Sequence, residues 1–113
     1  MSGPTVALVS GDLLLGSRLR AALAGTAAVR AARTVDDIGD AATVFVDLNA
    51  DGEARIEVVA ELHERGDVRI VGFCQHDERD LRVRDMAAGA DQVVTNGTLQ
   101  EAALRILRGA SRA

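Results

Sequence analysis

Hydrophobic residues fall into five short runs along the chain, and each run is followed by a stretch with helical spacing. The runs occupy 5–9, 27–32, 42–47, 68–74 and 91–95. The first, third and fourth runs are apolar along almost their whole length, which is typical of strands covered on both faces of a parallel sheet. Strands that alternate with helices in this way predict an α/β fold with a parallel sheet and right-handed crossovers.

Helix start signals support the first two helical stretches. Asp12 is the expected N-cap of a first helix that ends at Gly25. Thr34 and Asp37 have the spacing of a capping box, which predicts a short second helix.

The last three helical stretches are bounded in the same way. The third stops at Gly66, with His63 near its C-terminal end, where the helix dipole favours a positive imidazole. Asp77 is expected to open the fourth helix. Thr98 and Glu101 have capping-box spacing at the start of the fifth.

The composition limits the chemistry. The 113 residues suffice for one domain, expected to span 1–113, and 48% of them are apolar. All 13 basic residues are arginine, so a mechanism that needs a lysine amine is excluded. The single Cys74 cannot form an internal disulfide, and no apolar stretch approaches the ~18 residues of a membrane span. We therefore expect a cytoplasmic protein without a membrane segment.

The charges argue against nucleic acid as a partner. The formal net charge is -4, whereas nucleic-acid binding needs a basic face. Acidic and basic residues also alternate within one stretch, which predicts a solvated mixed-charge face. Its members are Asp77, Glu78, Arg79, Asp80, Arg82, Arg84 and Asp85.

Polar residues follow four of the five runs, and they define the candidate site. An open parallel sheet binds ligands outside the carboxyl ends of its strands. The residues at these ends are Ser10, Gly11, Asp12, Asp47, Cys74, Gln75, His76, Thr95, Asn96 and Gly97.

Three phrases near these ends resemble segments of the receiver domain of bacterial two-component response regulators. They are VFVDLNADG at 44–52, IVGFCQHD at 70–77 and MAAGADQVVTNG at 86–97. The resemblance extends from about Thr5 to Arg108. It implies a flavodoxin-like (βα)5 three-layer sandwich with strand order 2-1-3-4-5, and a role in phosphorelay signal transduction.

The resemblance also assigns roles to the site positions. Asp47 matches the phosphoacceptor, whose carboxylate becomes an acyl phosphate. The magnesium-binding acidic pair falls on Ser10 and Gly11, with Asp12 one position later. The phosphoryl-binding Ser or Thr falls on Cys74, with Gln75 following it. The Lys-Pro pair falls on Asn96 and Gly97, and the aromatic switch position falls on Val93.

This chain lacks the acidic pair, the Ser or Thr and the Lys at these positions, which predicts a degenerate site. A divalent cation needs several oxygen ligands, and a phosphoryl group needs donors and a counter-charge. We therefore expect a pseudo-receiver that is not an enzyme and needs no cofactor. Mg²⁺ would bind weakly, through Asp12 and Asp47 with Asp51 nearby. By family analogy, the partner is a sensor kinase, another regulator or a second copy in a homodimer. It would dock on the face formed by the fourth helix, fifth strand and fifth helix.

Two other functions remain open. The chain could be a phosphoaccepting response regulator modified on Asp47. It could also be a small-ligand sensor that uses Asn96, Gln75 and Ser10 as neutral polar contacts.

Some candidate residues have simpler structural interpretations. Asp47 can be an inherited acid whose oxygens accept N–H bonds from neighbouring loops. Cys74 followed by His76 could be a reactive thiol, but a lone Cys at the end of a buried strand is typically an apolar filler. Gly11 and Gly97 are expected to permit tight turns.

Overall fold

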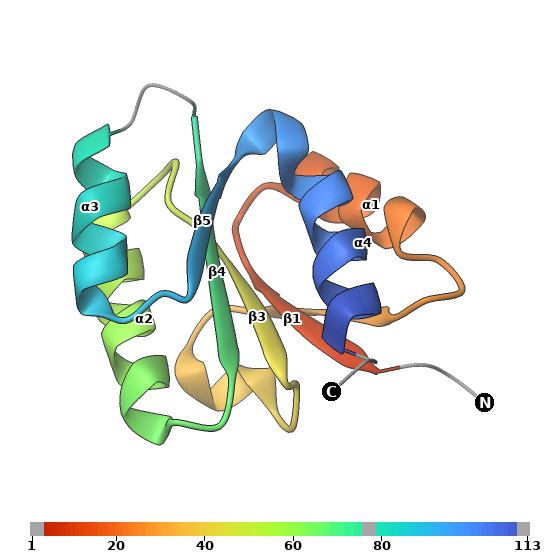
Figure 1. Ribbon diagram of the computed structural model, residues 1–113, viewed down its shortest axis with the longest axis horizontal. Coiled ribbons are helices and arrows are strands. Elements are labelled where there is room, and N and C mark those ends of the chain that lie inside the picture. Colours follow the sequence, from red (N-terminus) through yellow and green to blue (C-terminus); the bar gives the residue numbers. More distant parts are fainter. Residues whose placement is uncertain (1–3, 76–78, 111–113) are drawn as a thin grey trace.

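The computed structural model describes residues 4–75 and 79–110, which form a five-stranded parallel sheet covered by helices on both faces (Figure 1). The strand order is β2-β1-β3-β4-β5, as predicted. The strands are β1 (Thr5–Val9), β2 (Ala28–Ala32), β3 (Thr43–Asp47), β4 (Arg69–Cys74) and β5 (Gln92–Thr95). Each lies within a residue of the hydrophobic run that predicted it.

Burial explains why β1, β3 and β4 are nearly continuous in apolar residues. All five residues of β3 are buried, as are the last four of β1 and the last five of β4. Helices cover both faces of these strands, so neither face has to be polar. The edge strand β2 differs, because three of its five residues are exposed.

Two hydrophobic clusters lie on opposite faces of the sheet. Helices α1 (Leu13–Ala22) and α4 (Leu99–Ala110) cover one face, while α2 (Gly52–Arg65) and α3 (Arg79–Ala88) cover the other (Figure 1). Both phenylalanines, Phe45 and Phe73, belong to the α1/α4 cluster. The α2/α3 cluster has no aromatic member and is built from small and branched side chains, Cys74 among them.

The second predicted helix is a single 3₁₀ turn, η1 (Val35–Ile38). The Asp37 carboxylate accepts hydrogen bonds from the backbone N–H groups of Arg33 and Thr34, and these bonds lower the pKa of Asp37. The expected cap therefore forms, but the segment is too short to continue as an α-helix. At the last helix, a 3₁₀ turn η2 (Asn96–Thr98) precedes α4. Thr98 consequently lies inside helical structure, and its hydroxyl donates to the carbonyl of Thr95.

The predicted mixed-charge face is wrong at one residue. Asp85 is 0% exposed, although Arg79, Asp80 and Arg84 are exposed as expected. Asp85 follows Leu81 by four residues on α3, so it shares the helix face that packs on the sheet. The expected roles of His76, Asp77 and Glu78 lie outside the described residues. Within the described part of the chain, no helix is long and apolar enough to cross a membrane.

Candidate functional site at the carboxyl ends of the strands

Parallel pairing brings the polar residues after β1, β3 and β5 to one edge of the sheet. Val9 pairs with Val46 in β3, and Cys74 pairs with Thr95 in β5. Ser10, Asp47 and Asn96 consequently lie together at this edge, and hydrogen bonds join them directly or through Asn49. We call the surroundings of these three residues and Asn49 the strand-end crevice, and Asp47 is the central residue.

Both oxygens of the Asp47 carboxylate accept hydrogen bonds. The Ser10 hydroxyl donates to Oδ2 at 2.5 Å. The backbone N–H of Asn49 and its side-chain Nδ2 both donate to Oδ1, each at 2.8 Å. Asp47 is only 5% exposed, so these donors replace water around its charge. Hydrogen bonds to an ionised acceptor are among the stronger ones in proteins. The carboxylate therefore has protein donors on both sides.

Asn49 also links the carboxylate to the far side of the crevice. Its Nδ2 donates to Asn96 Oδ1 at 3.0 Å, and Asn96 Nδ2 donates back to Asn49 Oδ1 at 3.2 Å. Asn49 was not among the predicted site residues. Its position two residues after an aspartate was the available signal, because an Asp side chain often accepts from the backbone N–H two residues on. The two amides join the β3 and β5 sides of the crevice.

Arg55 is the second site residue that the sequence analysis missed. It lies in the first turns of α2, and its NH1 donates to the main-chain carbonyls of Val9 at 2.9 Å and of Asp47 at 3.1 Å. One guanidinium nitrogen thus joins the ends of β1 and β3. It contacts the main chain of Asp47, whereas Ser10 and Asn49 contact the carboxylate.

The three acids proposed as weak magnesium ligands differ in exposure, because Asp47 is buried whereas Asp12 and Asp51 are exposed. Asp12 is exposed, and its Oδ1 accepts from the backbone N–H of Leu15 at 3.1 Å, which is the predicted N-cap. Asp51 is exposed and adopts a left-handed conformation with φ 54 before α2. Among the described residues, no three or more His, Cys, Asp or Glu side chains form a group suited to a metal ion.

Gly11 and Gly97 lie in turns between strand and helix as expected, Gly11 in the bend after β1 and Gly97 in η2, but neither turn requires glycine. Neither has a positive φ, and a Cβ added at either would meet no atom within 4 Å. Both positions therefore face open space and would accept a side chain. Gln75 is exposed at the end of β4, and the preceding Cys74 is buried in the α2/α3 cluster, as expected of an apolar filler.

Two candidates lie away from the crevice wall. Val93 is partly buried against the α2/α3 cluster. His63 is in the last turn of α2, and its ring lies against Gly89 at the end of α3. A Cβ added at Gly89 would approach the His63 ring to 2.3 Å, so this close packing depends on glycine.

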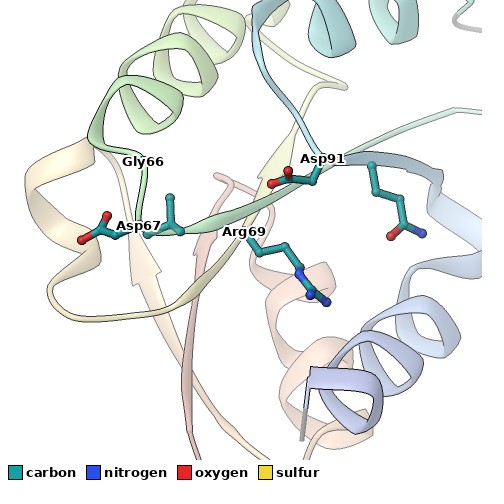
Figure 2. A pocket seen from close by; sticks show the side chains of 6 residues that line it. Gly66, Asp67, Arg69 and Asp91 are labelled. Carbon is teal, nitrogen blue, oxygen red and sulfur yellow. The ribbon is translucent and has the colours of Figure 1, made fainter. Parts of the chain in front are cut away.

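A pocket lies at the opposite edge of the sheet, where β4 and β5 begin. Its volume is about 550 Å³, and it is lined by Gly66, Asp67, Val68, Arg69, Asp91 and Gln92. Figure 2 shows Asp67, Arg69 and Asp91 around it. The Asp91 carboxylate already accepts from the backbone N–H of Ile70 at 2.8 Å. None of the residues predicted for the site lines this pocket.

Comparisons with known proteins identify the fold. No protein-family model and no curated protein matches the chain. The structure is similar to the receiver domain of the TMAO respiratory system response regulator TorR, with a TM-score of 0.82 and 20% identity over 96% of this chain and 98% of that one. It is also similar to a response regulator from Thermotoga maritima, with a TM-score of 0.76 and 21% identity over 94% of this chain and 98% of that one.

A third similar structure is a response regulator protein from Burkholderia pseudomallei with a phosphorylated aspartic acid, a calcium ion and citrate. Its TM-score is 0.75, with 20% identity over 92% of this chain and 66% of that one. The strand order and these structural matches together show that this chain has the CheY-like, flavodoxin-like fold of response-regulator receiver domains.

Proposed function

We propose that this chain is a receiver domain of cytoplasmic two-component signalling that acts as a pseudo-receiver. In this role it is a protein–protein interaction module that works without standard Mg²⁺-dependent phosphorylation. The observation that carries the proposal is the hydrogen bonding of Asp47, because Ser10 and Asn49 occupy both oxygens of the carboxylate.

Phosphorylation would have to disrupt this arrangement. An attacking carboxylate oxygen must be accessible to the phosphoryl donor, and the product carries new negative charge that needs compensation. Ser10, Asn49 and Asn96 are neutral, so none supplies such a charge. Arg55 is cationic, but its NH1 is directed to two main-chain carbonyls. The crevice is therefore better suited to holding a resting carboxylate than to stabilising an acyl phosphate.

The partner is a second protein, for which the face formed by α3, β5 and α4 is the proposed docking site. Val83 and Met86 support this assignment, because they are apolar side chains on α3 that are 61% and 47% exposed. A sensor kinase or another regulator fits the same proposal. A second copy of the chain is the simplest partner to test.

A phosphoaccepting regulator is the second candidate function. It is favoured by the position of Asp47 at the carboxyl end of β3 and by the phosphorylated aspartic acid named for the similar Burkholderia pseudomallei structure. Under this alternative, the Ser10 bond would open and Asp47 would accept the phosphoryl group.

Phosphorylation with a small donor separates the two candidates. Wild-type protein is incubated with acetyl phosphate and Mg²⁺ and is analysed by intact mass. We expect no phosphoryl adduct. A repaired variant carries Ser10→Asp, Gly11→Asp, Cys74→Thr and Asn96→Lys, and there is room for the new side chain at Gly11. It should gain one phosphoryl group, and adding Asp47→Asn should remove that gain. A wild-type adduct lost in Asp47→Asn would overturn the pseudo-receiver proposal.

The docking face has its own test. Sedimentation of the wild-type chain over a range of concentrations measures self-association. Val83→Glu with Met86→Glu should abolish it, because two charges would be placed in the proposed apolar contact. Leu13→Glu with Leu14→Glu is the matched control, since these side chains are 87% and 61% exposed on α1. Loss of association in the control alone would assign the interface to α1 instead.

A further inference from the structure

Asp85 on α3 is a buried acid with no hydrogen-bond partner. Its residue is 0% exposed, and neither Oδ1 nor Oδ2 has a donor. Buried polar atoms in folded proteins are nearly always paired, and an unpaired charge in such a place is costly. The strand-end crevice does not use this residue, so its burial needs a separate explanation.

The carboxyl group lies against the bare backbone of Gly72 in β4. A Cβ added at Gly72 would lie 1.9 Å from Asp85 Oδ2 and 3.1 Å from Leu48 Cδ1. The absence of a side chain at Gly72 thus creates the space that the carboxyl fills. Ile70 and Cys74, the neighbours of Gly72 on the same face of β4, belong to the apolar α2/α3 cluster. The group is therefore held between a helix and the middle of a sheet.

The charged groups of the surrounding elements are engaged elsewhere or remain at the surface. On α2, Glu53 pairs with Arg84 of α3, and both are well exposed. The Asp91 carboxylate accepts from Ile70. The other titratable or charged groups on these three elements are Arg55, Glu57, Glu61, His63, Glu64 and Arg65 on α2, Arg79, Asp80 and Arg82 on α3, and Arg69 and Cys74 on β4. None of them donates a hydrogen bond to Asp85.

Burial makes the neutral acid the favoured form. It raises the pKa of Asp85 from 3.8 to about 7. When α3 separates from the sheet, the carboxyl becomes hydrated and returns toward its ordinary pKa. Between the two values the docked state therefore holds a proton that the undocked state releases. Docking is strongest at low pH, weakens as the pH rises toward 7, and changes little above it.

We propose that α3 is a pH-responsive helix, docked on β4 while the Asp85 carboxyl is protonated and loosened when that carboxyl is ionised. The site is the pair formed by Asp85 and Gly72, and the ligand is a proton. Because α3 also carries Val83 and Met86, loosening would alter the face proposed for docking. The inference does not depend on whether Asp47 is phosphorylated.

Amide hydrogen exchange tests the proposal directly. Exchange in α3 is measured from about pH 5 to pH 8 and corrected for the intrinsic pH dependence by reference to α1 and α4. In wild-type protein, the opening equilibrium of α3 should rise roughly tenfold per pH unit at first and level off above pH 7. In Asp85→Asn, which keeps the shape but does not titrate, it should stay constant.

Two further measurements keep the test decisive. Asp80→Asn is the matched control, because it removes an exposed acid from the same helix and should leave the wild-type profile unchanged. The carbon chemical shift of the Asp85 carboxyl gives its titration without any substitution, and a midpoint near 7 is expected. A midpoint near 4, or identical α3 profiles in wild-type protein and Asp85→Asn, would overturn the proposal.

Discussion

Asp47 and Asp85 show two different ways in which a folded protein accommodates a buried carboxyl group. Asp47 is 5% exposed and Asp85 is 0% exposed, so burial hardly distinguishes them. Asp47 accepts three hydrogen bonds, whereas neither oxygen of Asp85 accepts any. Their surroundings differ because loops at the ends of strands offer unused donors. In the middle of a sheet and a helix, the backbone N–H groups are already paired.

The two solutions have different consequences. A carboxylate with three donors holds those donors in place, so Asp47 fixes the geometry of the loops around it. A carboxyl group without donors favours its neutral form, so Asp85 makes the packing of α3 sensitive to protons. Substitutions at the two sites should therefore have effects of different size and sign.

Gly72→Ala should have the largest effect, a loss of about 2–3 kcal/mol in the free energy of unfolding, because overpacking a core forces side chains and backbone to shift. The new Cβ would lie 1.9 Å from the Asp85 carboxyl. Urea unfolding measures the loss. Asp85→Ala in the same chain should recover most of it, because it removes the clashing oxygen. If the double variant is as unstable as the sum of the single ones, Asp85 does not fill the space at Gly72.

Replacing each acid by its amide should change stability in opposite directions. At pH 7.5, Asp47→Asn should cost about 2 kcal/mol, because one amide hydrogen then faces a donor and the charge-assisted bonds are lost. Asp85→Asn should instead stabilise by about 1 kcal/mol, because no charge has to be buried. Urea unfolding at pH 7.5 and pH 5.5 measures both changes.

The pH dependence provides the control for this pair. Asp85 is protonated in the folded protein at pH 5.5, so the gain from Asp85→Asn should shrink there. If Asp47→Asn and Asp85→Asn both destabilise the protein at pH 7.5 and at pH 5.5, the two carboxyl groups contribute to stability in the same way. That result would contradict the comparison.

The fold was predictable from sequence because its signals are local and repeated. Continuous apolar runs identified β3 and β4, and Asp12 marked the start of α1 correctly. The short second helix was placed correctly after Thr34 as the 3₁₀ turn η1, because the capping box of Thr34 and Asp37 marks where a helical turn starts. The burial of Asp85 was missed because alternating charges suggested an exposed face, although its spacing from Leu81 placed it toward the sheet.

The site was only partly predictable. The carboxyl ends of the strands gave Ser10, Asp47 and Asn96, because parallel strands bring such residues to one edge. Arg55 was missed because its partners are main-chain carbonyls, which no side-chain motif records. Gly11 and Gly97 were correctly expected in turns, but the sequence could not show that these turns do not require glycine. The sequence alone does not show whether a glycine has a positive φ, or whether a neighbouring side chain fills the space of its missing Cβ. It also does not show whether that space is open to solvent.

The smallest effects should come from Gly11→Ala and Gly97→Ala at the strand-end crevice. Neither glycine has a positive φ and neither Cβ would meet an atom within 4 Å, so the folded state should accept both methyl groups. Alanine also restricts the unfolded chain, and each variant should be unchanged or more stable by up to about 1 kcal/mol. Urea unfolding of these two variants and of Gly72→Ala measures the effect. The three substitutions add the same methyl group, at one filled position and at two open ones. A loss above about 1 kcal/mol in the free energy of unfolding of either variant would contradict this expectation. It would mean that the added methyl group meets neighbouring atoms in the strand-end crevice.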